Sequence, residues 1–104
     1  MKLDLKEWIN KVTDMFHAPF TLGTVTITYG TIAMTAQGTK AIPTVAKYEP
    51  LCVAGWANGG STQFYPYEIH LSGNNVICNV RNYYSSQLTG CSITVYILYR
   101  YVGG

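Results

Sequence analysis

The sequence predicts a mostly β protein: a single antiparallel β-sandwich, jelly-roll-like or a small barrel, preceded by one short α-helix. Over residues 92–101 the side chains alternate with a period of two, which is the spacing of a β-strand with one buried face. From residue 24 onwards, roughly six or seven short runs of β-branched and aromatic residues are separated by Gly, Asn and Pro. Helical spacing occurs only within residues 4–16.

The length and composition indicate one domain with an unusually uncharged surface. A chain of 104 residues suits a single core, and we expect an amphipathic helix over residues 1–18 and a β-sandwich domain over residues 19–104. Charged residues make up only 12% of the chain, about half the usual share. Either neutral polar side chains cover the surface, or copies of the chain bury part of it. We favour burial in a homo-oligomer.

The N-terminal segment has the pattern of a short amphipathic helix. Asp4 can cap its first turn, with Glu7 three residues later completing a capping box, and Pro19 closes the element. The apolar residues fall at spacings of three and four: Leu5, Trp8, Ile9, Val12, Met15 and Phe16. A helix this short is marginal alone in water, so this stripe must pack on its own sheet or on the helices of neighbouring subunits.

The first strands are predicted in the middle of the chain. Residues 24–29 alternate, and Gly30 then shifts the apolar phase by one residue, which predicts a bulge or a turn. Residues 41–46 predict a weak strand that Pro43 confines to an edge or a strand start. The run LCVAGWA at 51–57 has small or apolar residues on both faces, which predicts a buried central strand.

The second half of the chain predicts three further strands. Residues 64–71 form one of them, with Glu68 and His70 facing solvent, and the turn signal SGNN leads into residues 76–81. We expect residues 76–81 and 92–101 to form a β-hairpin, or two neighbouring antiparallel strands, joined by a tyrosine-bearing loop.

The two faces of the last strand differ from the usual pattern. Ile93, Val95, Ile97, Tyr99 and Tyr101 form one face, which we expect to fill the core. The other face should be polar if water covered it, but it carries Tyr96 and Leu98 between Thr94 and Arg100. This pattern indicates that another subunit or the N-terminal helix covers the second face.

Few residues offer catalytic or metal chemistry. The chain has two His, two Asp and three Glu, and no nucleophile, P-loop or metalloprotease motif, so we expect a non-enzymatic protein without a cofactor. Glu68 and His70 could orient one another, although a surface histidine is the simpler interpretation. Three cysteines at wide spacings are interpreted as small buried hydrophobes: Cys52, Cys78 and Cys91. A Cys3His zinc site with His17 or His70 fails because no two ligands share a turn.

Several other classes of function are also disfavoured. The few Lys and Arg are scattered, which argues against nucleic-acid binding. No apolar run approaches the roughly 18 residues of a membrane span, and no signal peptide is recognised, so we expect folding in a cytoplasm and no membrane insertion. The final Gly103-Gly104 invites comparison with ubiquitin-like modifiers, which fails because the only predicted helix precedes all the strands.

Aromatic and amide residues near two loops form the candidate ligand site. The chain has nine Tyr, two Trp and three Phe, and those within the strand patterns are expected in the core or at an interface. The candidate ligand-binding residues lie in or beside residues 57–63 and 82–90: Trp56, Asn58, Tyr65, Tyr67, Tyr83 and Tyr84. Aromatic faces beside amides suit stacking on sugar rings, but the same composition also suits structural packing or a protein contact surface.

Four segments resemble a family of small proteins and C-terminal domains of phages and prophages from Gram-positive gut bacteria. They are KLDLKEWINKVTDM, YEPLCVAGW, LSGNNVICNVRN and SITVYILYRY. The resemblance implies a β-sandwich that assembles as a trimer on the virion, at the tail or tail fibre, often at a receptor-binding tip. The chain lacks the shaft of a long fibre.

We therefore expect a tail-associated, homo-oligomeric structural protein of the virion that binds a host-surface glycan or another tail protein. A free-standing bacterial carbohydrate-binding module is the main alternative. A prophage assembly factor that stays in the cytoplasm and is absent from the finished particle is a third possibility.

Overall fold

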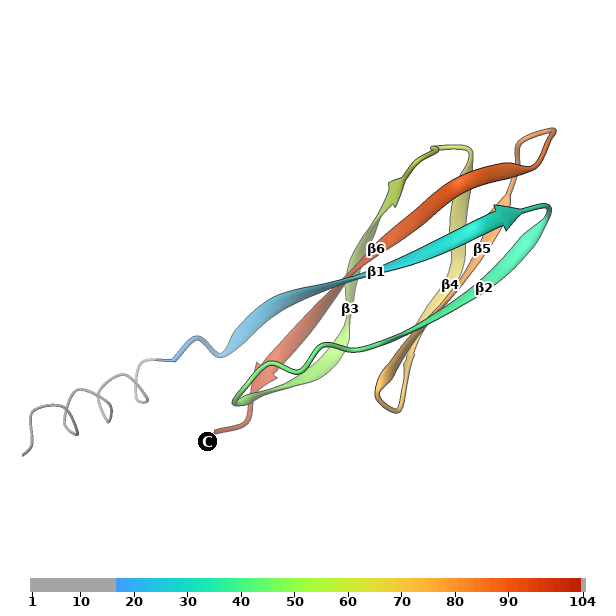
Figure 1. Cartoon of the computed structure of the whole chain (residues 1–104). Helices are drawn as coiled ribbons and strands as arrows, with labels where there is room; N and C mark the ends of the chain where they lie inside the picture. The colour runs from blue at the N-terminus through green and yellow to red at the C-terminus, as the bar shows by residue number, and fades with distance from the viewer. Residues whose placement is uncertain (1–16, 104) are drawn as a thin grey trace, which may run out of the picture.

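The computed structural model describes residues 17–103, which form two three-stranded antiparallel sheets (Figure 1). The strands are β1 (Phe20–Ile32), β2 (Thr35–Ala41), β3 (Tyr48–Gly59), β4 (Phe64–Ser72), β5 (Asn75–Asn82) and β6 (Leu88–Tyr101). The first sheet has the order β1-β6-β3 and the second has the order β2-β5-β4. The mostly β, antiparallel fold is confirmed. The helix predicted within residues 1–18 falls on positions outside the described residues.

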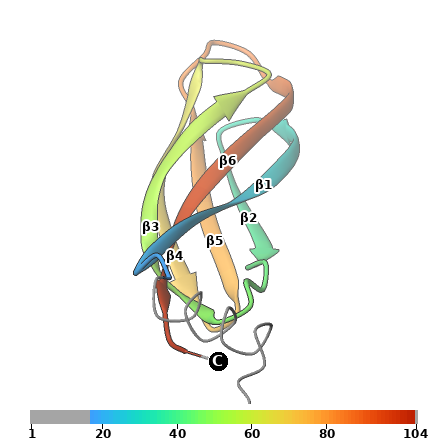
Figure 2. The same cartoon turned by 90° about the vertical axis from the view of Figure 1, so that its left-hand side faces the viewer.

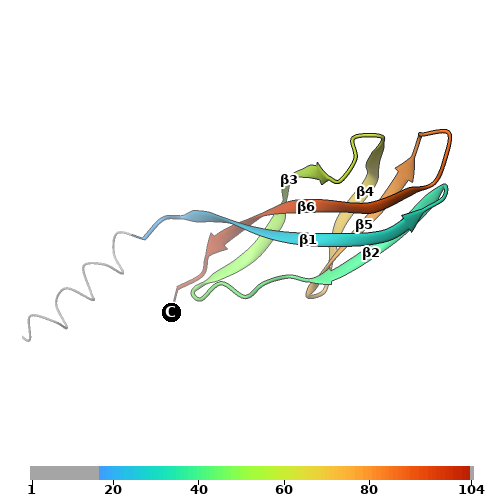
Figure 3. The ribbon, with the colours of Figure 1, turned by 45° about the horizontal axis from the view of Figure 1, so that its top comes forward.

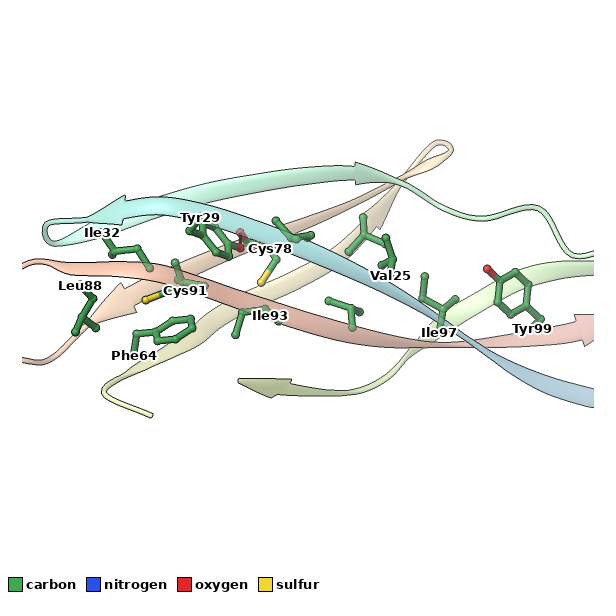
Figure 4. Close-up of a cluster of buried hydrophobic side chains, with 14 residues drawn as sticks. Val25, Tyr29, Ile32, Phe64, Cys78, Leu88, Cys91, Ile93, Ile97 and Tyr99 are labelled. Atoms are coloured by element: carbon green, nitrogen blue, oxygen red, sulfur yellow. Dashed lines mark hydrogen bonds between the residues drawn. The ribbon is translucent and has the colours of Figure 1, made fainter. Parts of the chain in front are cut away.

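The two central strands, β5 and β6, supply most of the core between the sheets (Figures 2 and 4). Every second residue of β6 from Cys91 to Tyr99 is fully buried, as its alternation predicts, while Tyr101 is only partly buried. Val76, Cys78 and Val80 of β5 are buried on the facing side. The predicted pairing of these two strands, as a hairpin or as antiparallel neighbours, is wrong because they lie in different sheets. Each strand buries one face, so they meet across the core as the centres of opposite sheets.

The run at residues 51–57 lies in an edge strand, which corrects its prediction as a buried central one. β3 pairs only with β6, and its register shifts on either side of Cys52–Val53. Proline has no N–H for a ladder, so Pro50 suits an edge position. The run appears apolar on both faces because bulges rotate its side chains and because an edge strand leaves Trp56 44% exposed.

The strand predicted at residues 41–46 is also wrong, because the second strand comes earlier in the chain. Residues 42–47 connect β2 to β3, and β2 has the sequence TAQGTKA. Its small residues have a packing reason. A Cβ at Gly38 would overlap Ile27 and come within 2.9 Å of the Tyr29 ring, so the large side chains of β1 occupy the space in front of β2.

The phase shift predicted at Gly30 is confirmed, but the strand neither turns nor ends there. Tyr29 and Ile32 are both buried although they are three residues apart, and β1 pairs with β6 as far as Ile32 (Figure 3). The same shift occurs in β6 beside Gly90, whose φ of 66° is readily adopted only by glycine. The two strands therefore change phase together and stay paired.

The cysteines divide into two buried thiols and one exposed thiol. Cys78 and Cys91 are fully buried, and burial raises the pKa of both thiols. Tyr29 donates a 2.7 Å hydrogen bond to the Cys78 carbonyl, and burial likewise raises the pKa of the Tyr29 hydroxyl. Cys52 is exposed, so the prediction that all three are buried is wrong for the cysteine of the edge strand.

The strand ends and connections lie at two opposite ends of the domain. Residues 17–19, 42–47, 73–74 and 102–103 form the proximal end, where the C-terminal end of β6 lies (Figure 1). Here the Tyr99 hydroxyl donates a 2.8 Å hydrogen bond to the Pro43 carbonyl, which ties the β2–β3 connection to the core. The connections 33–34, 60–63 and 83–87 form the distal end.

Candidate ligand-binding site

Three of the predicted site residues gather at the distal end, in what we call the distal aromatic cluster: Tyr65, Tyr83 and Tyr84. The ring centroids of Tyr65 and Tyr83 lie 5.7 Å apart with an interplanar angle of 36°. Tyr65 is the second residue of β4, and Tyr83 and Tyr84 open the β5–β6 connection, so the cluster joins two elements that β5 separates in the sequence. All three side chains are exposed, Tyr83 by 60%.

Two hydrogen bonds hold Tyr83 in place, one from its side-chain hydroxyl and one from its backbone N–H. Its hydroxyl donates a hydrogen bond to the Thr62 carbonyl, and its backbone N–H donates to the Gln63 carbonyl at 3.1 Å. These contacts fix an exposed aromatic face against the 60–63 connection. A ring that is ordered before binding loses less conformational entropy when a ligand stacks on it.

Asn82 lies buried beneath the cluster and joins two of the distal connections. Its Nδ2 donates to the carbonyls of Ile32, Ala33 and Ser86 at 3.0, 3.3 and 2.9 Å, and its Oδ1 accepts from the Tyr84 N–H at 2.7 Å. Its backbone N–H donates to the Met34 carbonyl at 2.9 Å. In the sequence alone, Asn82 is the first residue of the predicted loop at 82–90. A polar residue that ends an apolar strand just before a long connection is the signal that could have identified it.

The other three predicted site residues lie away from the cluster. The Asn58 amide donates a 2.6 Å hydrogen bond to the Phe64 carbonyl, so it links β3 to β4 rather than facing a ligand. Trp56 is paired with Val95 on the inner side of β3, and Tyr67 lies at the register shift of β4. Both are exposed along the edge where β3 and β4 face one another, because no further strand covers that edge.

The outer face of the second sheet continues from the cluster as a polar surface. Arg81 is directly opposite Tyr65, and directly opposed residues of an antiparallel pair project on the same face. Further along, Glu68 accepts a 2.7 Å hydrogen bond from Asn79 and forms an ion pair with His70 Nδ1. The solvent-facing positions predicted for Glu68 and His70 are confirmed.

The outer face of the first sheet carries an apolar stripe in its proximal half, beside the ion pair of Arg100 and Glu49. This apolar stripe consists of Phe20, Leu22, Cys52, Tyr96 and Leu98. Leu22, Leu98 and Cys52 stand side by side across the three strands, and Leu22 is 62% exposed. The distal half of this face is polar and begins at Thr26 and Thr94. The hydroxyl oxygens of these two residues lie 3.1 Å apart. The stripe is therefore confined to the half nearer residue 17.

A shallow pocket of about 280 Å³ lies at the proximal end, lined mainly by residues 41–45 and by Tyr48 and Tyr99. Its carboxylate, Glu49, forms an ion pair with Arg100. Among residues 17–103, no group of three His, Cys, Asp or Glu side chains could hold a metal ion. In the same range, no helix has the length and apolarity to cross a membrane.

The described residues thus offer two surfaces with different chemistry: an apolar stripe near the proximal end and an exposed aromatic cluster at the distal end. Comparison of the chain with protein-family models, with curated proteins and with solved structures found no match.

Proposed function

We propose that the chain is a non-enzymatic structural protein of a phage or prophage virion. In this proposal it is a jelly-roll-like β-sandwich associated with the tail and assembled as a homo-oligomer, with a trimer favoured. The observation that carries the proposal is the placement of the two surfaces. An apolar stripe beside the proximal end suits contact between copies, and an aromatic cluster at the opposite end remains free to bind a host-surface glycan.

The apolar stripe supports the oligomer because it is too apolar for a face covered only by water. Exposed apolar patches on soluble proteins commonly mark interaction sites. Leu22 and Leu98 are paired across β1 and β6, and the Tyr96 ring lies 3.9 Å from the position of a Cβ at Gly55. The stripe is therefore a continuous surface across the sheet, which a second copy can bury.

Replacing Leu98 with Lys is expected to convert the oligomer to a monomer without unfolding it. The side chain is on the outer face, so a charge there disturbs a contact between copies while the core stays intact. Size-exclusion chromatography with multi-angle light scattering measures the mass, and circular dichroism measures the fold. Thr94→Lys, on the same strand and face but outside the stripe, is the matched control and should remain oligomeric. A wild-type monomer at all dilutions, or a Leu98→Lys variant that unfolds, contradicts the proposal.

The distal aromatic cluster supports ligand binding because its rings are exposed and the Tyr83 ring is held by the hydrogen bond of its hydroxyl. Loss of one stacking ring corresponds to about a fivefold weakening of binding when the contact contributes on the order of 1 kcal/mol. We expect Tyr83→Ala to weaken binding on a glycan array by about this factor. Tyr67→Ala is the matched control, since Tyr67 is 55% exposed but lies outside the cluster. Equal losses in the two variants, or none in either, would remove the cluster from the proposed function.

The Leu98→Lys and Tyr83→Ala variants also separate the proposed function from its alternatives. A free-standing carbohydrate-binding module would bind its glycan as a monomer, so the Leu98→Lys variant would keep full binding and the wild type would show no oligomer. If no glycan binds but Tyr83→Ala breaks association with a purified tail protein, the cluster is a protein contact. Mass spectrometry of purified virions decides between a structural protein and an assembly factor that is absent from the particle.

A further inference from the structure

The position of Arg81 beside the distal aromatic cluster carries an inference about the class of ligand. Arg81 lies in the central strand of the second sheet, between Tyr65 on β4 and Thr35 on β2, with all three residues directly opposed. Opposed residues on one face of an antiparallel pair have Cβ atoms about 5 Å apart. Because the Tyr83 ring contacts the Tyr65 ring at a tilt, the guanidinium and both tyrosines belong to one surface.

The carboxylates of the described residues are already engaged elsewhere. Glu68 is the nearest on this face, and one of its oxygens binds His70 while the other accepts from Asn79. Glu49 forms its ion pair with Arg100 on the first sheet. Glu49 and Glu68 are the only acidic residues within 17–103, so no carboxylate in that range is left to pair with Arg81.

Arg81 is also exposed at the surface, and it forms no ion pair with any residue that the structure describes. An arginine presents several N–H donors in a planar fork, which matches the two oxygens of a carboxylate or the oxygens of a phosphate. An arginine beside fixed aromatic rings offers two kinds of contact at once: ring stacking for an apolar sugar face and paired hydrogen bonds for an anion.

We propose that Arg81, Tyr65 and Tyr83 form a subsite for a saccharide bearing an anionic group. The sugar ring stacks on the tyrosines, and its carboxylate or phosphate pairs with the Arg81 guanidinium. This inference rests on the proposed glycan-binding function and narrows it from glycans in general to acidic ones. Glu68 contributes to the selectivity, because its carboxylate is held further along the same pair of strands, β4 and β5, and repels an anion placed there.

The test is isothermal titration of the full-length protein with matched acidic and neutral probes. Trigalacturonic acid is compared with its methyl ester for the carboxylate, and mannose 6-phosphate with mannose for the phosphate. We expect at least one acidic probe to bind tenfold or more tightly than its neutral counterpart. Sodium chloride should weaken this binding, since the pair is close to solvent.

Variants then assign the preference to the guanidinium. Arg81→Gln should abolish the difference between acidic and neutral probes together with its salt dependence, and Arg81→Lys should keep part of the difference because it keeps the charge without the fork. Lys40→Gln on β2 removes the same charge from the same sheet and is the control, which should bind as the wild type does. Circular dichroism checks that each variant folds.

The outcomes separate the two proposals. If acidic and neutral probes bind equally and only Tyr83→Ala weakens binding, the anionic subsite is wrong while glycan binding stands. If the Arg81→Gln variant still prefers acidic probes, another group binds the anion and the assignment to Arg81 is overturned. If no probe and no array glycan binds, the glycan function falls together with the inference.

Discussion

Replacing Asn82 with Ala is expected to lower the free energy of unfolding by about 3 kcal/mol, because it leaves several polar groups at the distal end without partners. The Ile32 and Ser86 carbonyls lose their donor, and the Tyr84 N–H loses its acceptor. Urea denaturation followed by circular dichroism measures the change. The protein concentration must be held fixed, since an oligomer is stabilised by mass action.

The control for this substitution is Asn79→Ala on the same strand. The Asn79 amide bonds only the exposed Glu68 side chain, so its removal should change the free energy of unfolding by less than about 0.5 kcal/mol. The distal connections should also loosen in the Asn82 variant, so ligand binding should weaken even under conditions where the protein stays folded. An Asn82→Ala protein as stable as the control would mean that water or other groups replace the lost hydrogen bonds.

Replacing Gly38 with Val is the second substitution expected to have a large effect, with a loss of about 3 kcal/mol from overpacking. A Cβ at this position overlaps Ile27 and crowds the Tyr29 ring, and both of these side chains are buried in the core. Because β2 pairs with β5 through this residue, the strand must move outwards to make room. Thermal and urea unfolding measure the loss.

Two further variants show whether crowding is the cause. Gly30→Ala on β1 places its methyl group where no atom lies within 4 Å, so it should leave stability almost unchanged. Adding Ile27→Ala to a Gly38→Ala protein should cost less than the sum of the two single changes, since the second change frees the space that the first one fills. Strict additivity would contradict the packing explanation.

Sequence could predict the strands whose own side chains alternate between apolar and polar residues, because that alternation shows which face is buried. β6 buries four large apolar residues at alternate positions, so its pattern is visible without knowledge of its partners. β2 has no such alternation, because the large side chains that pack against its inner face, Ile27 and Tyr29, belong to β1. The sequence also did not show which strands pair with one another. Nothing local in β5 and β6 distinguishes two neighbouring strands from two strands that face one another across a core.

The candidate site was predictable in part for a related reason. Loop proximity selected Tyr65, Tyr83 and Tyr84, which the fold brings to one end of the domain as exposed side chains, because aromatic residues beside polar connections tend to be exposed. The same criterion also selected Asn58 and Trp56, which the fold places on an edge strand. Arg81 could not be joined to the tyrosines from sequence, since their proximity depends on the register between β4 and β5.

The two prolines of the edge strands affect whether another chain can pair with the exposed edges of the two sheets. Pro50 of β3 and Pro66 of β4 each lie beside a shift in strand register, and both strands are at the same side of the two sheets. A strand added there would meet missing N–H donors and uneven spacing. Edge-to-edge pairing along that side is therefore disfavoured, so the homo-oligomer that we propose would form through the outer face of the first sheet rather than through this edge.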